Sequence, residues 1–333
     1  MKDKKFSVPY NGINPDLFLN LLEPYKEHVE HIYLGVSSIT RNFDDYSIMP
    51  NKKIRKEDGT VLSKEEYEEN CFQFLLKTKD TYKTILTLNA GHYIFSEGEM
   101  YEWCDNVLFP FIEIAGINGC IVTCYDMAKY IHESMPHLEM HTSCNNFQWK
   151  LRQMELWQKH CGISVFNPPR EILRSPKNLK EMHDAGFKIK AIVNQACLYG
   201  CPQTINHCIT NSVGGWIGSN CHKGEFVNFF KSNWILPTWL DDLDEYVDIY
   251  KIIGRTVIDY SYIFNTLDAY IKREDVDDIK KILLGGTCNY VFKDATTAIP
   301  SKDIPKKLLT CECSECNKTC FICDNLLKKY LKN

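Results

Sequence analysis

Apolar residues along the chain form short continuous runs, separated by longer stretches in which apolar and polar residues alternate with helical spacing. Eight runs rich in β-branched or aromatic residues predict strands over residues 31–36, 84–89, 119–124, 138–143, 163–167, 189–195, 234–238 and 247–253. Helices are predicted over residues 64–79, 97–115, 126–135, 145–161, 178–185 and 240–246. Within 145–161, one apolar helix face is predicted from Phe147, Leu151, Met154 and Trp157.

This alternation of strand and helix predicts an α/β fold. Eight units with continuously apolar strands favour a parallel sheet closed into a (β/α)8 barrel of the TIM type. An open doubly wound sheet is the alternative, but no glycine-rich phosphate loop follows the first predicted strand. We therefore expect a barrel over residues 1–290.

Two regions depart from the alternation. Residues 196–233 follow the sixth predicted strand and are too long for an idle connector, so we expect them to be functional. Residues 291–333 follow a helical stretch, 260–284, and contain five cysteines. We expect these residues to form a Cys-rich, metal-binding tail.

Composition narrows the class of protein. The chain has 333 residues and a net charge of −4, so no broad positive field attracts nucleic acid or anionic lipid, although a local basic groove would escape this argument. We find no apolar run long enough for a membrane helix and no signal peptide, which predicts a cytoplasmic protein. In a reducing compartment, clustered thiols indicate metal binding or redox chemistry, and the chain has 16 cysteines.

The long loop contains the first group of cysteines. Cys197, Cys201, Cys208 and Cys221 are separated by three, six and twelve residues. In a barrel enzyme this loop leaves the carboxyl end of a strand, where active sites form. The open spacing favours an iron–sulfur cluster, while a zinc site or scattered buried thiols remain alternatives.

The tail contains the second group. Five thiols within thirteen residues are too close to pair stably with one another, so we expect metal binding by Cys311, Cys313, Cys316, Cys320 and Cys323. A structural zinc site, a second cluster and a ligand donated to the barrel cluster all fit this spacing.

Several segments together resemble the peptidase U32 family: residues 6–12, 33–35, 193–207, 234–237 and 250–255. The resemblance implies a TIM-type barrel and a [4Fe-4S] cluster held by four cysteines. It also implies oxygen-independent hydroxylation of ubiquinone precursors or RNA bases. From it we take Cys197, Cys201 and Cys221 as ligands and leave the fourth open among Cys208, a tail cysteine and an exchangeable substrate. The gap between Cys197 and Cys201 is shorter than in larger members of the family.

Polar residues beyond the predicted strands suggest how a substrate is bound. Arg41 follows the first predicted strand, and Lys251 and Arg255 lie at the end of the last. A guanidinium there would hold a carboxylate or phosphate through two hydrogen bonds, so we expect an anionic small molecule. His207 would donate a hydrogen bond to a cluster sulfur or act as an acid or base.

These observations predict an iron–sulfur oxidoreductase that hydroxylates, or transfers a related atom to, a small-molecule substrate, with a redox or sulfur-donor protein as a possible partner. A sulfur transferase and a zinc-stabilised binding protein without catalytic activity are the alternatives. Peptidase activity is disfavoured because the sequence contains neither G-x-S-x-G nor H-E-x-x-H.

Overall fold

The structure is a computed structural model of the 333-residue chain. It describes residues 4–40, 62–90, 96–212, 226–255, 257, 259–284, 297–311 and 320–330.

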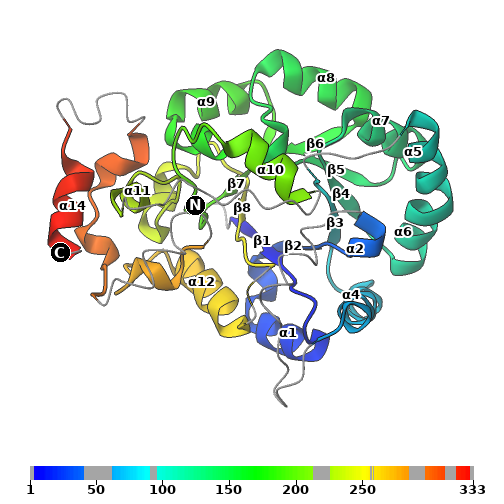
Figure 1. The fold of residues 1–333 in the computed structure, drawn as a ribbon, viewed down its shortest axis with the longest axis horizontal. Helices are drawn as coiled ribbons and strands as arrows, with labels where there is room; N and C mark the ends of the chain where they lie inside the picture. Colours follow the sequence, from blue (N-terminus) through cyan, green and yellow to red (C-terminus); the bar gives the residue numbers. More distant parts are fainter. Residues whose placement is uncertain are drawn as a thin grey trace.

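Eight parallel strands close into a barrel, which confirms the predicted fold class and rules out the open doubly wound sheet. In chain order the strands are β1 Lys5–Pro9, β2 Val29–Leu34, β3 Thr84–Leu88, β4 Gly119–Val122, β5 Glu139–Thr142, β6 Ile163–Phe166, β7 Lys188–Ile192 and β8 Ile249–Lys251. Each strand pairs with the next, and β1 pairs with β8. Figure 1 shows the strands at the centre, with helices around them.

The helices of the described chain lie mainly between consecutive strands. They are α1 Pro15–Leu22, α2 Ser37–Thr40, α4 Lys64–Thr78, α5 Glu97–Trp103, α6 Phe109–Ala115, α7 Tyr125–Ser134, α8 Leu151–Cys161, α9 Pro176–Asp184, α10 Thr204–Ser212, α11 Val227–Phe230, α12 Tyr260–Lys272 and α14 Ile322–Tyr330. A π-helical turn, Cys104–Leu108, joins α5 to α6 within the predicted helix over 97–115. The start of the predicted helix over 145–161 is corrected, because Phe147 has a left-handed backbone with φ 54° and the helix begins at Leu151.

One predicted strand is wrong, and one strand was missed. Residues 234–238 form no strand; they are a buried extended segment in which the backbone N–H of Ile235 donates to Val193 O at 2.9 Å. Pro237 then begins a 3-10 turn, Pro237–Asp242, which covers only residues 240–242 of the helix predicted over 240–246. Residues 243–246 form turns, so that predicted helix is wrong. The missing strand is β1, whose short run between lysines and Pro9 carries little apolar signal.

Local sequence signals fix several helix ends. Ser63 and Glu66 form a reciprocal capping box at the start of α4, and Ser96 and Glu99 form another at α5. At the other end, Gly116 ends α6 with φ 66°, in the left-handed region that glycine adopts without strain.

The barrel interior is unusually polar. Its only separate apolar cluster among the described residues consists of Tyr33, Ile85 and Ile121, where TIM-type barrels usually have layers of branched aliphatic residues. His31, His141 and Lys190 are fully buried there. Lys190 Nζ lies 2.6 Å from His141 Nδ1, and His141 Nε2 lies 2.9 Å from Glu139 Oε1.

These interior contacts determine the protonation of the network. Burial, followed by the charge of Lys190, lowers the pKa of His141 to about 3. Neutral His141 therefore donates from Nε2 to Glu139 and accepts at Nδ1 from Lys190. Burial alone would raise the pKa of Glu139, but His141 and Lys83 lower it to about 2.

The described part of the tail packs onto the barrel. Ile299, Ile304, Leu308 and Leu309 are buried in the main core cluster, and so are Cys323, Leu326 and Tyr330 of α14. Helix α14 packs on α11 at the edge of the molecule (Figure 1).

Candidate functional site

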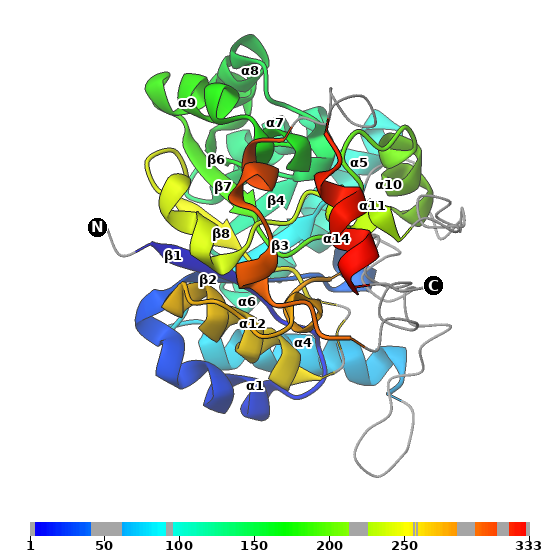
Figure 2. The ribbon, with the colours of Figure 1, turned by 90° about the vertical axis from the view of Figure 1, so that its left-hand side faces the viewer.

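The candidate site lies at the carboxyl ends of β5 to β8. Helices α10 and α11 belong to the loop after β7. They lie on one side of the barrel, and the N-terminus and the start of β1 lie on the opposite side (Figure 2). In (β/α)8 barrels this face carries the functional loops.

Arg170 is at the centre of this site, and sequence reasoning missed it. It begins the 3-10 turn Arg170–Arg174 after β6. Its Nε donates to Gln195 Oε1, which holds the side chain against the start of the long loop. Its Nη2 lies 3.5 Å from Asn145 Oδ1, which reaches it from the loop after β5.

Three of the predicted cysteine ligands lie around this arginine. The charges of Cys197 and Cys208 both raise the pKa of Arg170. The charge of Cys201 raises the pKa of the Cys197 thiol. Burial raises the pKa of the Cys197 thiol, and the positive charge of Arg170 opposes that effect. The loop after β7 therefore brings Cys197, Cys201 and Cys208 to one place, although they belong to separate turns of the chain.

A fourth thiol was also missed, because it comes from a different loop. Cys144 follows β5 and is buried. The Sγ atoms of Cys144 and Cys208 lie 3.5 Å and 3.4 Å from the same oxygen, Asn145 Oδ1. Only closure of the barrel brings residues 144 and 208 together, so no spacing in the sequence indicates it.

His207 lies on α10 beside the same group. Burial lowers its pKa, and the charge of Arg170 lowers it further. The imidazole is therefore held in its neutral form, in which one nitrogen donates and the other accepts.

A second group of cations lies in the barrel mouth beside these thiols. Lys251 Nζ is 4.0 Å from the centroid of the Tyr33 ring, and the guanidinium carbon of Arg255 is 5.9 Å from the same centroid. Arg255 Nη1 donates to Thr87 Oγ1 at 2.7 Å. Tyr33 is fixed in turn by a 2.8 Å hydrogen bond from its hydroxyl to Ile252 O.

The remaining predicted site residues divide into two sets. Cys311, at the end of the 3-10 turn Lys306–Thr310, accepts at its backbone oxygen from Arg174 Nη1 at 3.4 Å. Cys320 is half-buried before α14, and Cys323 is buried within it. The other set, Arg41, Cys221, Cys313 and Cys316, lies outside the described residues.

Within the part of the chain that the structure describes, no three His, Cys, Asp or Glu side chains are close enough to bind one metal ion. Zinc–sulfur bonds of about 2.3 Å would hold thiolates roughly 4 Å apart. A cluster with one thiolate on each iron spreads its ligands farther. Among the described residues, the thiols around Arg170 are therefore not arranged as the ligands of one metal ion.

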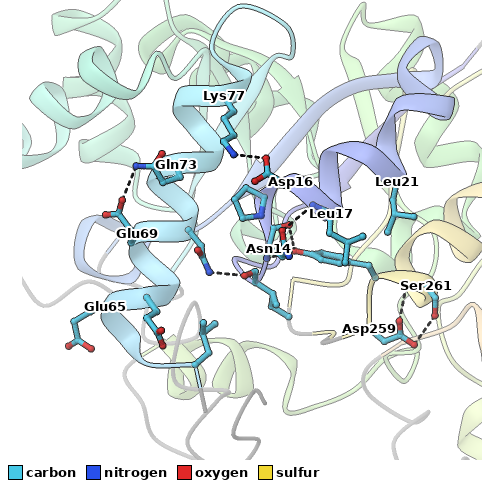
Figure 3. Close-up of a pocket in the computed structure, with 16 residues that line it drawn as sticks. Asn14, Asp16, Leu17, Leu21, Glu65, Glu69, Gln73, Lys77, Asp259 and Ser261 are labelled. Atoms are coloured by element: carbon cyan, nitrogen blue, oxygen red, sulfur yellow. Dashed lines mark hydrogen bonds and ion pairs between the residues drawn. The ribbon is translucent and has the colours of Figure 1, made fainter. Parts of the chain in front are cut away.

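A cavity of about 1350 Å³ lies elsewhere, on the outside of the barrel among α1, α4 and the start of α12 (Figure 3). Its carboxylates have structural partners: Asp16 pairs with Lys77, Glu69 accepts from Gln73 at 2.8 Å, and Asp259 caps α12. None of the cysteines that the structure describes lines it. We therefore place the functional site at the barrel mouth.

No helix among the described residues is both long and apolar enough to cross a membrane. No family model matches the chain, and neither does any curated protein sequence.

Among solved structures, the chain is similar to one titled "The Structure of the U32 Peptidase Mk0906". The two superpose with a TM-score of 0.52 at 7% sequence identity, over 75% of this chain and 93% of that chain. The fold is therefore U32-like, in agreement with the resemblance seen in the sequence. At this identity the similarity concerns the fold alone.

Proposed function

We propose that this protein is an iron–sulfur oxidoreductase that binds its cluster at the barrel mouth. The observation that carries the proposal is the gathering of Cys197 and Cys208 around the half-buried Arg170, with Cys201 acting on Cys197. Cys221 follows on the same loop and keeps its predicted place in the ligand set. When bound, such a cluster would exchange single electrons with a substrate in the mouth.

The residues around the thiols suit this role. Arg170 offsets the negative charge that thiolates bring into the barrel mouth. Its neighbour Asn145 Oδ1 lies 3.5 Å and 3.4 Å from the Sγ atoms of Cys144 and Cys208. Neutral His207 lies beside Arg170 and has a nitrogen available to move a proton. Arg255 is placed to hold an anionic group of the substrate.

The reaction we propose is oxygen-independent hydroxylation, or a related atom transfer, on a small anionic molecule in the cytoplasm. Its support is the U32-like fold together with the mouth cations. Hydroxylation with water as the oxygen source removes two electrons from the substrate, and a separate redox protein would accept them. A metal site in the tail, formed by Cys311, Cys313, Cys316, Cys320 and Cys323, is proposed on their spacing alone.

Anaerobic purification followed by iron, sulfide and zinc analysis tests the proposal. We expect a coloured protein with iron and sulfide. Cys197→Ala and Cys201→Ala should each lose most of the visible absorption, because each removes a thiolate ligand. The matched control is Cys161→Ala, a buried thiol at the end of α8 whose Sγ contacts Tyr125 O, and this variant should keep the colour.

A colourless protein with stoichiometric zinc would overturn the proposal in favour of a zinc-stabilised protein. Colour retained in Cys197→Ala would remove that residue from the ligand set.

A further inference from the structure

Lys251 occupies an unusual position for a lysine. It is the last residue of β8, and its side chain lies inside the barrel mouth with 5% of its surface exposed. Its neighbours in register are Ser7 on β1 and Ile192 on β7. Among the described residues, no carboxylate forms an ion pair with its ammonium group, whose contact is the face of the Tyr33 ring at 4.0 Å.

The groups that face Lys251 oppose its positive charge. Burial has the largest effect and lowers the pKa of Lys251. Cys144 raises this pKa, whereas the positive charges of Arg255 and Arg170 lower it further, so that it falls to about 7. Lys190 and His31 lie below it in the interior and are electrostatically coupled to it. A lysine that is desolvated and next to other cations is a nucleophile at neutral pH.

Arg255 adds recognition to this nucleophile. Its guanidinium is held by Thr87 Oγ1 at 2.7 Å and lies near the same Tyr33 ring as the Lys251 amine. Guanidinium groups recognise carboxylates through two parallel hydrogen bonds. One substrate with a carbonyl next to a carboxylate would therefore meet both groups.

The other buried lysine of the interior, Lys190, does not have an amine that faces the mouth. Lys190 is already hydrogen-bonded to His141 Nδ1 at 2.6 Å, deeper in the barrel. Its amine is thus engaged by the His141 network, whereas that of Lys251 faces the mouth.

We propose that Lys251 forms an imine with the carbonyl carbon of a small 2-oxo acid whose carboxylate is bound by Arg255. The amine lone pair attacks the carbonyl carbon, and the resulting carbinolamine loses its oxygen as water, leaving a C=N bond in place of C=O. Hydrolysis reverses the step, so no oxidant or reductant is needed. The activity goes beyond the proposed cluster chemistry and requires no metal.

Reductive trapping tests this proposal on the wild-type chain. The protein is incubated near neutral pH with pyruvate or glyoxylate and cyanoborohydride, and each lysine peptide is then quantified by mass spectrometry. An ordinary lysine has a pKa of about 10.4, so its neutral fraction near pH 7 is roughly a thousandfold below that of Lys251. We expect labelling of Lys251 to exceed that of Lys188, on neighbouring β7, by at least about tenfold.

Two variants refine the test. Lys251→Arg keeps the charge but should abolish labelling in the peptide that contains position 251. Arg255→Gln should raise several-fold the 2-oxo acid concentration needed for half-maximal labelling, while labelling by a neutral aldehyde such as propanal should change little. Thermal melts of both variants establish that they fold.

Labelling of Lys251 no greater than that of Lys188 in the wild-type chain would overturn the proposal, whether or not the variants fold. An equal effect of Arg255→Gln on pyruvate and propanal would remove the carboxylate from the substrate class. Iron and sulfide analysis is a separate measurement, so failure here is distinguishable from failure of the cluster proposal.

Discussion

At the scale of single residues, the mouth of the barrel is organised by Arg170. Its Nε donates to Gln195 and its Nη2 lies 3.5 Å from Asn145, so two loops are joined through one guanidinium. Its charge acts on Cys197, Cys208 and His207. Lone arginines are common in sequences, which is why nothing around position 170 indicated this role.

Replacing Arg170 with Gln should lower the reduction potential of the proposed cluster, because the reduced form carries one more negative charge and loses its neighbouring cation. A redox titration followed by visible absorption or electron paramagnetic resonance measures this shift. Arg170→Lys keeps the charge and should recover part of the potential. An unchanged or higher potential in Arg170→Gln would mean that Arg170 does not act on the cluster.

At the scale of elements, the sequence predicted best those segments whose local signals were strong. The predicted helix over 64–79 matches α4, because amphipathic spacing and the capping box at Ser63 give the same start. Residues 234–238 were wrongly predicted to form a strand, because a segment buried on all sides has the same apolar composition whether or not it pairs in a sheet. Strand β1 was missed because five residues ending in proline offer little periodicity.

The capping box of α4 allows a direct test at this scale. Ser63 Oγ accepts from the backbone N–H of Glu66 at 3.1 Å, and Ser63 N–H donates to Glu66 Oε2 at 2.9 Å. Ser63→Ala should lower the free energy of unfolding by about 1 kcal/mol, measured by denaturant titration. Ser63→Thr keeps the hydroxyl and should cost less, whereas equal losses in both variants would argue against the cap.

At the scale of the whole molecule, the polar interior links stability to pH. His141 is buried and neutral, with its pKa lowered to about 3, whereas in the unfolded chain it protonates near the usual value of about 6.5. Between these values the unfolded state binds more protons, so stability is full above about 6.5 and falls as the pH drops toward 3. Glu139, with its pKa lowered to about 2, acts in the same direction at still lower pH.

Urea unfolding measured from about pH 7 to about pH 4 should therefore show a steady loss of stability, with His141 contributing up to about 1.4 kcal/mol per pH unit. His141→Gln should reduce this slope by the share of His141, while the neighbouring His31, whose pKa burial also lowers, continues to contribute. His137→Gln replaces an exposed histidine and should leave the slope unchanged. A slope in His141→Gln equal to that of the wild-type chain would exclude His141 as its source.

The sequence by itself determined the alternation of strands and helices and the loop on which Cys197, Cys201 and Cys208 lie, whereas its eight predicted strands included one that is wrong and omitted β1. These features depend on local periodicity and spacing, which a linear chain records. Only the tertiary structure brought Arg170, Cys144 and Asn145 to those thiols, and only it turned Lys190 and Lys251 into the barrel. Such contacts join strands that are far apart in the sequence, and they arise because closing the sheet brings the carboxyl ends of all eight strands together.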